Sequence, residues 1–532
     1  MGEFFMKVPS LTRTTARAGI GLLLVGLGVA PGASVGADAG EAVVPTVVDV
    51  ASLPVGGGVA QSTLQFLFPA GQSALDAAKA SAASYAPSTG IQDVGAAAGS
   101  PPPSLVGGGV GVNQTDTSCS CIPPDGGFAV SPNYFIAAAN TAFKEFSSSG
   151  GLVAGPIEFS KFWGNACFNN FSDPVLEYDN AAGRFVFSVV SYDSSYDSSL
   201  CMAVSASGNP KSKWYRYSFV QKNASLSHDL LDQPRFAIGS DAIYATGNQF
   251  EGNTAYFGPR VMALNKAQMY AGLPATWKYH DLSSNYDTLN PARNIGTSVS
   301  PYTEPGYFVS VDNNVCPPSC SYVYEWKWTT PFATDTFTMQ GSVAITGFAE
   351  PVNAVQQGAG AVVQTNDARE LAAFYSHGTI YGTHSIGCLP AGSTNVSDCV
   401  QWYQLANIDG APTLRQQGIL GSLGKFLYYP SLASDKNDDV IIGYAFSSAT
   451  DYIGTRYTGR LSGDPLNTMR SDATLKAGEG TNIDAAIRWG DYAATAIAPD
   501  GCRAFHFEEF APANELTNDW STWYGIIKFP NC

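Results

Sequence analysis

The chain is poor in charge. Only 14% of its 532 residues are charged, against about 25% in an average protein. Lys and Arg number 28 against 44 Asp and Glu, which leaves a net charge of −16. Binding to nucleic acid depends on clustered Lys and Arg that displace counterions from the phosphates. The composition therefore excludes a nucleic-acid-binding protein.

Familiar catalytic and cofactor-binding motifs are also missing. The sequence has no His-Glu-x-x-His zinc motif, no phosphate-binding loop and no dinucleotide fingerprint. Histidine is scarce, with five residues in all. Of these we expect His384 to be buried and hydrogen-bonded, since backbone groups easily satisfy an imidazole nitrogen. No motif of this kind assigns a reaction to the chain.

Long apolar segments are absent apart from one short run near the N-terminus. Arg13 and Arg17 precede the apolar residues 20–30, and small residues follow at 35–37. A basic flank, a short apolar core and small residues at the cleavage point are typical of a secretory signal peptide. The run is shorter than the ~20 residues that span a bilayer, and an uncleaved anchor is the alternative. We expect residues 1–37 to be a signal peptide, no membrane span after its removal, and a protein that is secreted, held at the cell surface or periplasmic.

The ten cysteines agree with export. An even number of cysteines in an exported chain favours disulfides over metal binding. The spacings predict two clips across hairpin loops, one bond from the C-terminus to the last sheet, and one bond between neighbouring strands. The pairs are Cys316 with Cys320, Cys388 with Cys399, Cys502 with Cys532, and Cys167 with Cys201.

Two kinds of sequence follow the N-terminal run. In residues 38–118 Ala, Gly, Ser, Pro and Val dominate, which predicts a linker or stalk. From 119 to 532 the chain consists of short β-rich runs broken by Gly, Pro, Asn and Asp, with almost no helical periodicity. This region is too long for one sandwich, so several sandwiches or a closed repeat array remain.

A weak repeat favours a β-propeller. Segments that open on Asp or Pro before a small-residue strand recur at steps of roughly 48 to 77 residues. Propeller blades repeat every ~40–50 residues before loop insertions are added. We therefore predict an all-β fold, a seven-bladed β-propeller over 119–532, in which each opening is an innermost strand. The openings are Asp125, Asp173, Asp232 and Asp491, with less marked ones near Arg293, Val352 and Tyr429.

Six groups of residues spread over 121–510 carry a family resemblance. They are Pro123-Pro124-Asp125 with Asn140-Thr141-Ala142; Asp173-Pro174-Val175 with Tyr178-Asp179 and Arg184; Ser218-Phe219 with Asp232-Gln233-Pro234; Gly382-Thr383-His384-Ser385; Arg456-Tyr457-Thr458-Gly459-Arg460; and Arg488-Trp489-Gly490-Asp491-Tyr492. The chain resembles a family of large secreted bacterial proteins, predicted to be propellers, near the BNR-repeat and sialidase-like folds. The resemblance implies the fold and export. This family has no settled activity, so no catalytic residue is transferred.

The aspartates at the blade openings are the first candidates for a functional site. A propeller usually presents its ligand site at one mouth of the axial channel, where these side chains would converge. Two carboxylates ~5–10 Å apart serve a glycosidase as acid and as nucleophile or base, and carboxylates also bind Ca²⁺. Alternatively each Asp accepts backbone N–H groups and fixes the turn between blades. The catalytic candidates are Asp173, Asp232 and Asp491, and the calcium candidates are Asp125, Asp173 and Asp491.

Arginines near the same openings suggest an anionic ligand. Guanidinium groups clamp carboxylate or sulfate, although salt bridges between blades are the alternative role. Arg369 lies near one opening as well. The predicted ligand-binding residues are Asp125, Arg235, Arg293, Arg488 and Tyr492.

Two functions follow from these patterns. The first is a monomeric, non-catalytic propeller that binds an extracellular glycan, polymer or protein at one mouth of the channel. The second is a polysaccharide hydrolase or lyase that uses the carboxylates there. No cofactor other than Ca²⁺ is expected. An open pocket with two carboxylates and an Arg pair would favour the enzyme, whereas a channel plugged by aromatic side chains would exclude it.

Overall fold

A computed structural model describes residues 37–56, 69, 71–95, 100–119, 122–297, 301–313, 320–358, 362–482, 488–513 and 520–532. Except for Ala37, the predicted signal peptide lies outside these residues. In the described part of the chain no helix is both long and apolar enough to reach across a bilayer.

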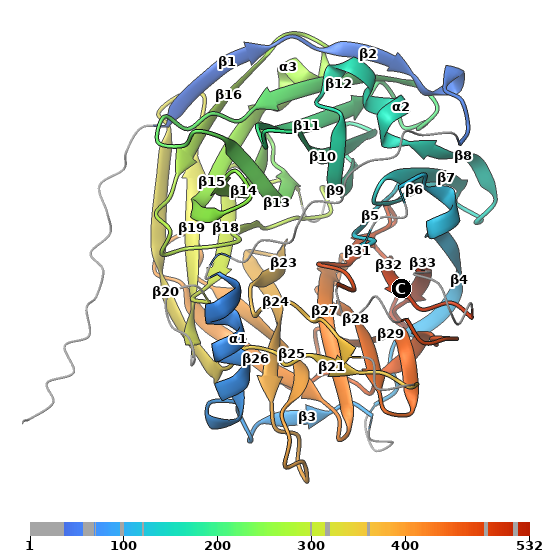
Figure 1. The fold of residues 1–532 in the computed structure, drawn as a ribbon, viewed down its shortest axis with the longest axis vertical. Helices are drawn as coiled ribbons and strands as arrows, with labels where there is room; N and C mark the ends of the chain where they lie inside the picture. Colours follow the sequence, from blue (N-terminus) through green and yellow to red (C-terminus); the bar gives the residue numbers. More distant parts are fainter. Residues whose placement is uncertain are drawn as a thin grey trace, which may run out of the picture.

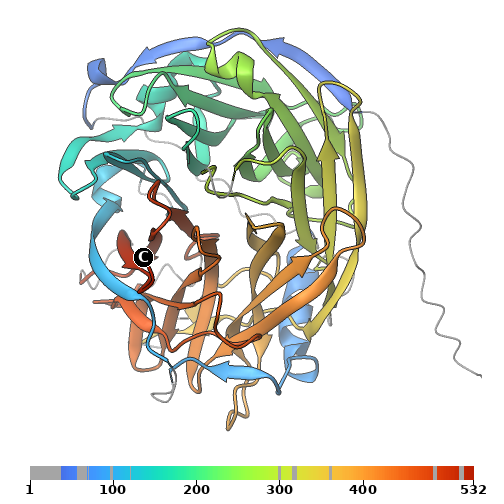
Figure 2. The same ribbon diagram turned by 180° about the vertical axis from the view of Figure 1, so that it is seen from behind.

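Seven sheets stand like blades around a central axis (Figures 1 and 2), which confirms the predicted seven-bladed propeller. Consecutive strands within each blade pair antiparallel. Blade 1 contains β5 (Gly126–Val130), β6 (Tyr134–Ala139), β7 (Ala142–Ser147) and β8 (Leu152–Glu158). Blade 2 contains β9 (Asn170–Asp179), β10 (Arg184–Tyr192), β11 (Ser198–Ser205) and β12 (Lys213–Val220). Blade 3 contains β13 (Asp229–Ile238), β14 (Ala242–Glu251), β15 (Ala255–Asn265) and β16 (Ala275–Asp281).

The other four blades complete the ring. Blade 4 contains β17 (Asn290–Pro291), β18 (Gly306–Val311), β19 (Cys320–Thr329) and β20 (Thr336–Phe348). Blade 5 contains β23 (Glu370–Ser376), β24 (Thr379–Cys388), β25 (Ser397–Ala406) and β26 (Thr413–Gly421). Blade 6 contains β27 (Lys425–Ser434), β28 (Val440–Ser448), β29 (Asp451–Arg460) and β30 (Ala473–Lys476). Blade 7 contains β31 (Ala494–Ile497), β32 (Arg503–Phe510) and β33 (Ser521–Lys528), and its outermost strand is β4 (Ser104–Asn113).

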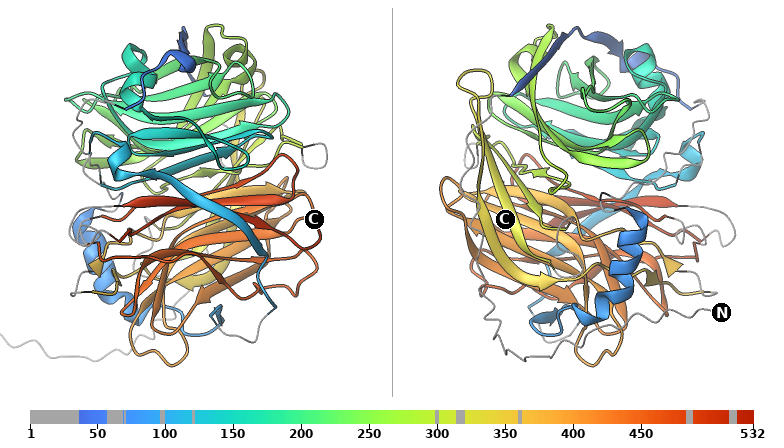
Figure 3. Two further views of the ribbon diagram at one scale, coloured as in Figure 1. Left: turned by 90° about the vertical axis from the view of Figure 1, so that its right-hand side faces the viewer. Right: turned by 60° about the vertical axis from the view of Figure 1, so that its left-hand side comes forward.

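The N-terminal segment straps the outside of the ring. Besides β4, it supplies β1 (Asp38–Val43) to blade 3, β2 (Thr46–Asp49) to blade 2 and β3 (Ile91–Asp93), which pairs in parallel, to blade 5. We call residues 38–113 the strap. The helix α1 (Gln72–Ser81), also part of the strap, lies against one face of the ring (Figure 3). The minor helices of the chain are η1 (Val50–Ser52), η2 (Ala82–Ser84), η3 (Gln114–Asp116), α2 (Phe159–Trp163), η4 (Gly164–Ala166) and α3 (Lys266–Tyr270).

This arrangement differs from the linker that composition predicts for residues 38–118. The glycines that resemble a linker allow β4 to lie close to large side chains of β33. A Cβ atom at Gly108 would lie only 2.8 Å from Trp523 Nε1 and 2.8 Å from Tyr524 O. Glycine-rich composition here reflects close packing of an edge strand rather than an unstructured chain.

Six of the seven predicted openings lie at or next to an inner strand, and one does not. The fifth inner strand, β23, begins at Glu370 and not near Val352. The intervening residues contain a separate short hairpin, β21 (Ala354–Val355) with β22 (Val362–Val363). This insertion moves the true opening away from the position that regular spacing indicates.

Apolar side chains fill the spaces between neighbouring blades, and three disulfides join pairs of described cysteines. One apolar cluster joins blades 2 and 3 through residues such as Met202 and Phe236. The predicted bonds Cys388–Cys399, Cys502–Cys532 and Cys167–Cys201 are confirmed. Cys320 is also disulfide-bonded, whereas its predicted partner Cys316 lies outside the described residues.

Candidate functional site

At five of the seven blades, a residue at or just before the inner strand has a left-handed backbone conformation. Five non-glycine residues at or just before inner strands have φ between 42° and 60°, a region that side chains disfavour. In blades 2, 3 and 6 a proline follows, and the register with the second strand shifts there, so the entry is a β-bulge. The five residues are Asp173, Gln233, Thr288, Asn366 and Tyr429.

Side chains of neighbouring blades hold these entries in place. At six junctions between blades, a side-chain oxygen of one blade accepts a hydrogen bond from a backbone N–H at the entry of a neighbouring blade, at 2.8–3.0 Å. We call the six accepting residues the acceptor ring. The acceptors and their donors are Asp125 with Asp491, Asn140 with Asp173, Asp173 with Gln233, Asn248 with Thr288, Glu350 with Ala368, and Ser385 with Tyr429.

The four aspartates of the marked openings come together as the repeat predicts. Asp125 interacts electrostatically with Asp491, Asp173 and Arg488. All four are buried, with exposures of 1% for Asp125, 5% for Asp173, 7% for Asp232 and 4% for Asp491. Burial raises the pKa of Asp173 to about 7 and that of Asp232 to about 6, although Arg488 partly offsets the effect. Burial also raises the pKa of Asp125 well above its ordinary value.

The predicted arginines lie in the same buried region. Arg488 forms an ion pair with Asp491. The guanidinium carbon of Arg235 lies 3.6 Å from the ring centre of Tyr492. Arg293 Nε lies 3.9 Å from Glu177 Oε1.

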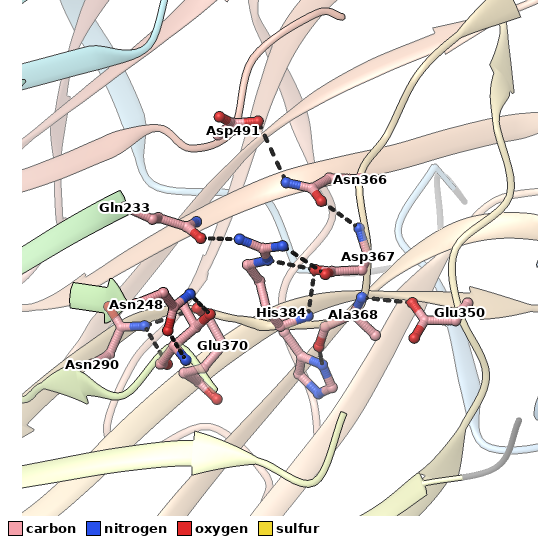
Figure 4. A network of polar contacts seen from close by, with 12 residues as sticks. Gln233, Asn248, Asn290, Glu350, Asn366, Asp367, Ala368, Glu370, His384 and Asp491 are labelled. Carbon is pink, nitrogen blue, oxygen red and sulfur yellow. Dashed lines mark hydrogen bonds and ion pairs between the residues drawn. The ribbon is translucent and has the colours of Figure 1, made fainter. Parts of the chain in front are cut away.

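Figure 4 shows a further network that the sequence did not indicate. Arg369 donates from Nε and Nη2 to the two carboxylate oxygens of Asp367, at 2.6 and 2.7 Å, and from Nη1 to the side chain of Gln233. Asn366 connects this pair to Asp491. The positive φ of Asn366 and the pairing of Arg369 with an acid two residues earlier are local features. The residues of other blades that Asn366 and Arg369 contact come close only when the ring closes, so the sequence does not indicate them.

The calcium site predicted at Asp125, Asp173 and Asp491 can be compared with the hydrogen bonds of the acceptor ring. In the described ranges, no group of three or more His, Cys, Asp or Glu side chains is placed to hold a metal ion. Asp125 accepts from Asp491 N and from Asn140 Nδ2, and Asp173 accepts from Gln233 N. These hydrogen bonds occupy part of the acceptor capacity of the two carboxylates.

Two small cavities on the axis are bounded by described residues. They measure about 30 and 40 Å³, and both are lined by Phe128, Leu176 and Arg293. Pockets for small organic ligands typically measure ~300–1,000 Å³. Neither cavity has room for a sugar ring.

A larger hollow lies at the rim, between the outer strands of blades 2 and 3. It measures about 360 Å³ and is lined by β1 and by side chains of β12 and β16. We call it the rim groove. β2 pairs with β12 only as far as Arg216, so the end of β12 beside the groove lacks this partner. Its side-chain lining includes Glu41, Ser218, Val220, Lys222, Trp277 and Tyr279.

Sequence reasoning did not find the rim groove. Its two walls come together because β1 pairs with β16, far along the chain, with Trp277 Nε1 donating to Glu41 O at 3.0 Å. The backbone of Gly40 lies on the indole, since a Cβ there would be 2.0 Å from Trp277 Cε2. No local pattern in the sequence reports such a pairing.

Comparisons with known proteins give structural matches only. No protein-family model matches the sequence, and no curated protein matches it. A hypothetical selenium-binding protein from Sulfolobus tokodaii matches with 8% identity and a TM-score of 0.41, covering 65% of this chain and 77% of the other. An α-L-arabinanase of Penicillium chrysogenum has 8% identity and a TM-score of 0.38, covering 79% and 98%.

Sialidases are also among the matched structures. A Trypanosoma rangeli sialidase has 9% identity and a TM-score of 0.35, covering 73% of this chain and 57% of the other. At these identities no activity and no residue role is transferred.

Proposed function

We propose that the protein is an exported, non-catalytic β-propeller that binds an extracellular glycan in the rim groove. The observation that carries the proposal is the difference in volume between the two axial cavities and the rim groove. The axis retains cavities of about 30 and 40 Å³, whereas the rim groove offers about 360 Å³. Only the latter falls in the range of ligand pockets.

The lining of the groove suits a sugar chain. Tyr279 is partly exposed there, and the guanidinium carbon of Arg260 lies 4.1 Å from its ring centre. Ser218 supplies a hydroxyl, while the exposed Lys222 and Glu41 supply an ammonium donor and a carboxylate acceptor. An aromatic face beside several hydrogen-bonding groups can bind both the apolar face and the hydroxyls of a pyranose.

Export is supported by the three disulfides between described cysteines and by the N-terminal sequence. Disulfides persist in oxidising compartments and are rare in the cytosol. An exported protein meets polysaccharides and surface glycans, which fits a binding role there. We also propose that it acts as a monomer.

A screen on immobilised glycans, followed by titration of the best ligand, tests the proposal. We expect Tyr279→Ala to weaken binding by about tenfold, because a stacked ring contributes roughly 1–2 kcal/mol. Tyr322→Ala is the matched control, since Tyr322 is 43% exposed on blade 4. Unchanged affinity in Tyr279→Ala, or binding only to protein ligands, would contradict the proposal.

A polysaccharide hydrolase or lyase at the axis is the second candidate. In its favour, Asp173 and Asp232 have raised pKa values, to about 7 and about 6, because they are buried. Carboxyl groups with raised pKa values are typical of general acids. Against it, Asp173 accepts a backbone hydrogen bond and neither side chain is more than 7% exposed.

A further inference from the structure

Four hydrogen-bond donors from four different blades surround the smaller axial cavity. They are Arg235 of blade 3, Arg293 beside blade 4, Ser431 of blade 6 and Tyr492 at the entry of blade 7. No carboxylate lines this cavity of about 30 Å³ among the described residues. The polar side chains in its lining are Arg235, Asn290, Arg293, Ser431 and Tyr492, and each of them can donate a hydrogen bond to an acceptor.

Three of these donors have no hydrogen-bond partner among the described residues. They are Nη2 of Arg235, the hydroxyl of Ser431 and the hydroxyl of Tyr492. The residues are 8%, 1% and 3% exposed. A buried donor without a partner costs about 1–3 kcal/mol, and more when it is charged. Three such groups around one cavity indicate that something in the cavity accepts their hydrogen bonds.

Two guanidinium groups line the cavity, and the carboxyl group that interacts with Arg235, that of Asp173, has its pKa raised to about 7 by burial. Arg235 forms no ion pair with any described carboxylate, and Arg293 has one described ion pair, with Glu177 at 3.9 Å, besides its hydrogen bond to Thr495 O. Burial raises the pKa of Glu177 to about 8, so that side chain is mainly neutral at pH 7. Burial lowers the pKa of Arg293, and repulsion between the two guanidinium groups adds to this effect. A negative charge between them would relieve this repulsion.

We propose that the smaller axial cavity binds a single halide ion, chloride in an extracellular setting, through Arg235, Arg293, Ser431 and Tyr492. A volume of about 30 Å³ holds about one or two water-sized particles. The ion would join blades 3, 4, 6 and 7 at the axis, a role separate from glycan binding at the rim.

Bromide provides a direct test, because its anomalous scattering distinguishes it from water. Crystals of the full chain grown in sodium bromide should show one anomalous peak on the axis, within hydrogen-bond distance of Arg235 and Tyr492. In solution, raising bromide at constant ionic strength, with gluconate as the replaced anion, should raise the melting temperature by mass action. Density for water alone, or equal melting temperatures in bromide and gluconate, would overturn the proposal.

Two conservative variants separate this site from general salt effects. Tyr492→Phe and Ser431→Ala each remove one donor and should weaken bromide binding by about tenfold or more, as expected for a hydrogen bond to a charged group. Ser188→Ala is the matched control, because Ser188 is also a buried serine whose hydroxyl lacks a described partner, on β10. If all three variants keep the bromide dependence of the wild type, the ion does not bind at this cavity.

Discussion

At the scale of single residues, two glutamic acids are buried without a hydrogen-bond partner among the described residues. Glu145 on β7 is fully buried, and neither of its carboxylate oxygens has a hydrogen-bond partner among the described residues. Burial raises its pKa to about 8. Glu325 on β19 is in the same situation, with a pKa raised to about 9. These side chains are kept neutral by the fold at neutral pH.

Glu145→Gln should make the protein less sensitive to rising pH. Above the unfolded pKa of about 4.5 the unfolded chain loses the Glu145 proton, while the folded chain keeps it up to about pH 8. Stability therefore falls across this window by about 1.4 kcal/mol per pH unit at most. A glutamine side chain at this position carries no such penalty, so the variant should gain melting temperature over wild type at pH 8 and little at pH 5.

Melting curves at pH 5 and pH 8 make the comparison, with the exposed Glu41→Gln as control. The control should follow the wild type at both pH values. An equal gain from Glu145→Gln at pH 5 and pH 8 would show that Glu145 is not buried as the neutral acid.

The strap is the main feature at the scale of elements. Each of β1, β2, β3 and β4 adds an outer strand to a blade, and β4 completes blade 7 from the N-terminal side of the chain. Such pairing joins distant parts of the sequence and closes the ring. The contact of β1 with blade 3 depends on Gly40, because Trp277 occupies the space of a side chain there.

Gly40→Ala should loosen β1 and destabilise the protein by about 1–3 kcal/mol, the usual cost of overpacking. A Cβ at Gly40 would lie 2.0 Å from Trp277, so the indole or the strand must move. Gly463→Ala makes the same chemical change at a position with nothing within 4 Å. Denaturant unfolding should separate the two variants, and equal stabilities would contradict the described packing of β1.

The sequence indicates the strands better than the connections between them. Six of the seven openings predicted inner strands correctly, and in blades 2, 3 and 6 the β-bulge has a local signature, as in Asp173-Pro174 and Gln233-Pro234. The hairpin β21–β22 displaced the fifth opening, and glycine-rich β4 resembled a linker. Both depend on partners that local composition does not report.

The candidate sites likewise contain some features that the sequence predicts and others that depend on distant partners. Convergence of Asp125, Asp173, Asp232 and Asp491 could be predicted from the repeat. The acceptors Asn140, Asn248 and Ser385 could not, because each belongs to one blade and binds the backbone of the next. The rim groove exists only once β1 has paired with β16.

At the scale of the whole molecule, the polar residues of the axis join blades to one another. Six junctions contain a hydrogen bond from the entry of one blade to a side chain of its neighbour, including the junction of blades 1 and 7. The two axial cavities lined by described residues are small, and a ligand-sized groove lies at the periphery. We propose binding at the rim without catalysis at the axis.

A reducing-end assay on a polysaccharide panel tests this claim most directly, with wild type and Asp173→Asn compared at equal concentration. The asparagine side chain of this variant retains an oxygen that can accept from Gln233 N, so the fold should persist and a melting curve checks it. We predict that wild type binds its glycan yet releases no more reducing ends than the variant. Release by wild type that Asp173→Asn abolishes, at an unchanged melting temperature, would contradict the account.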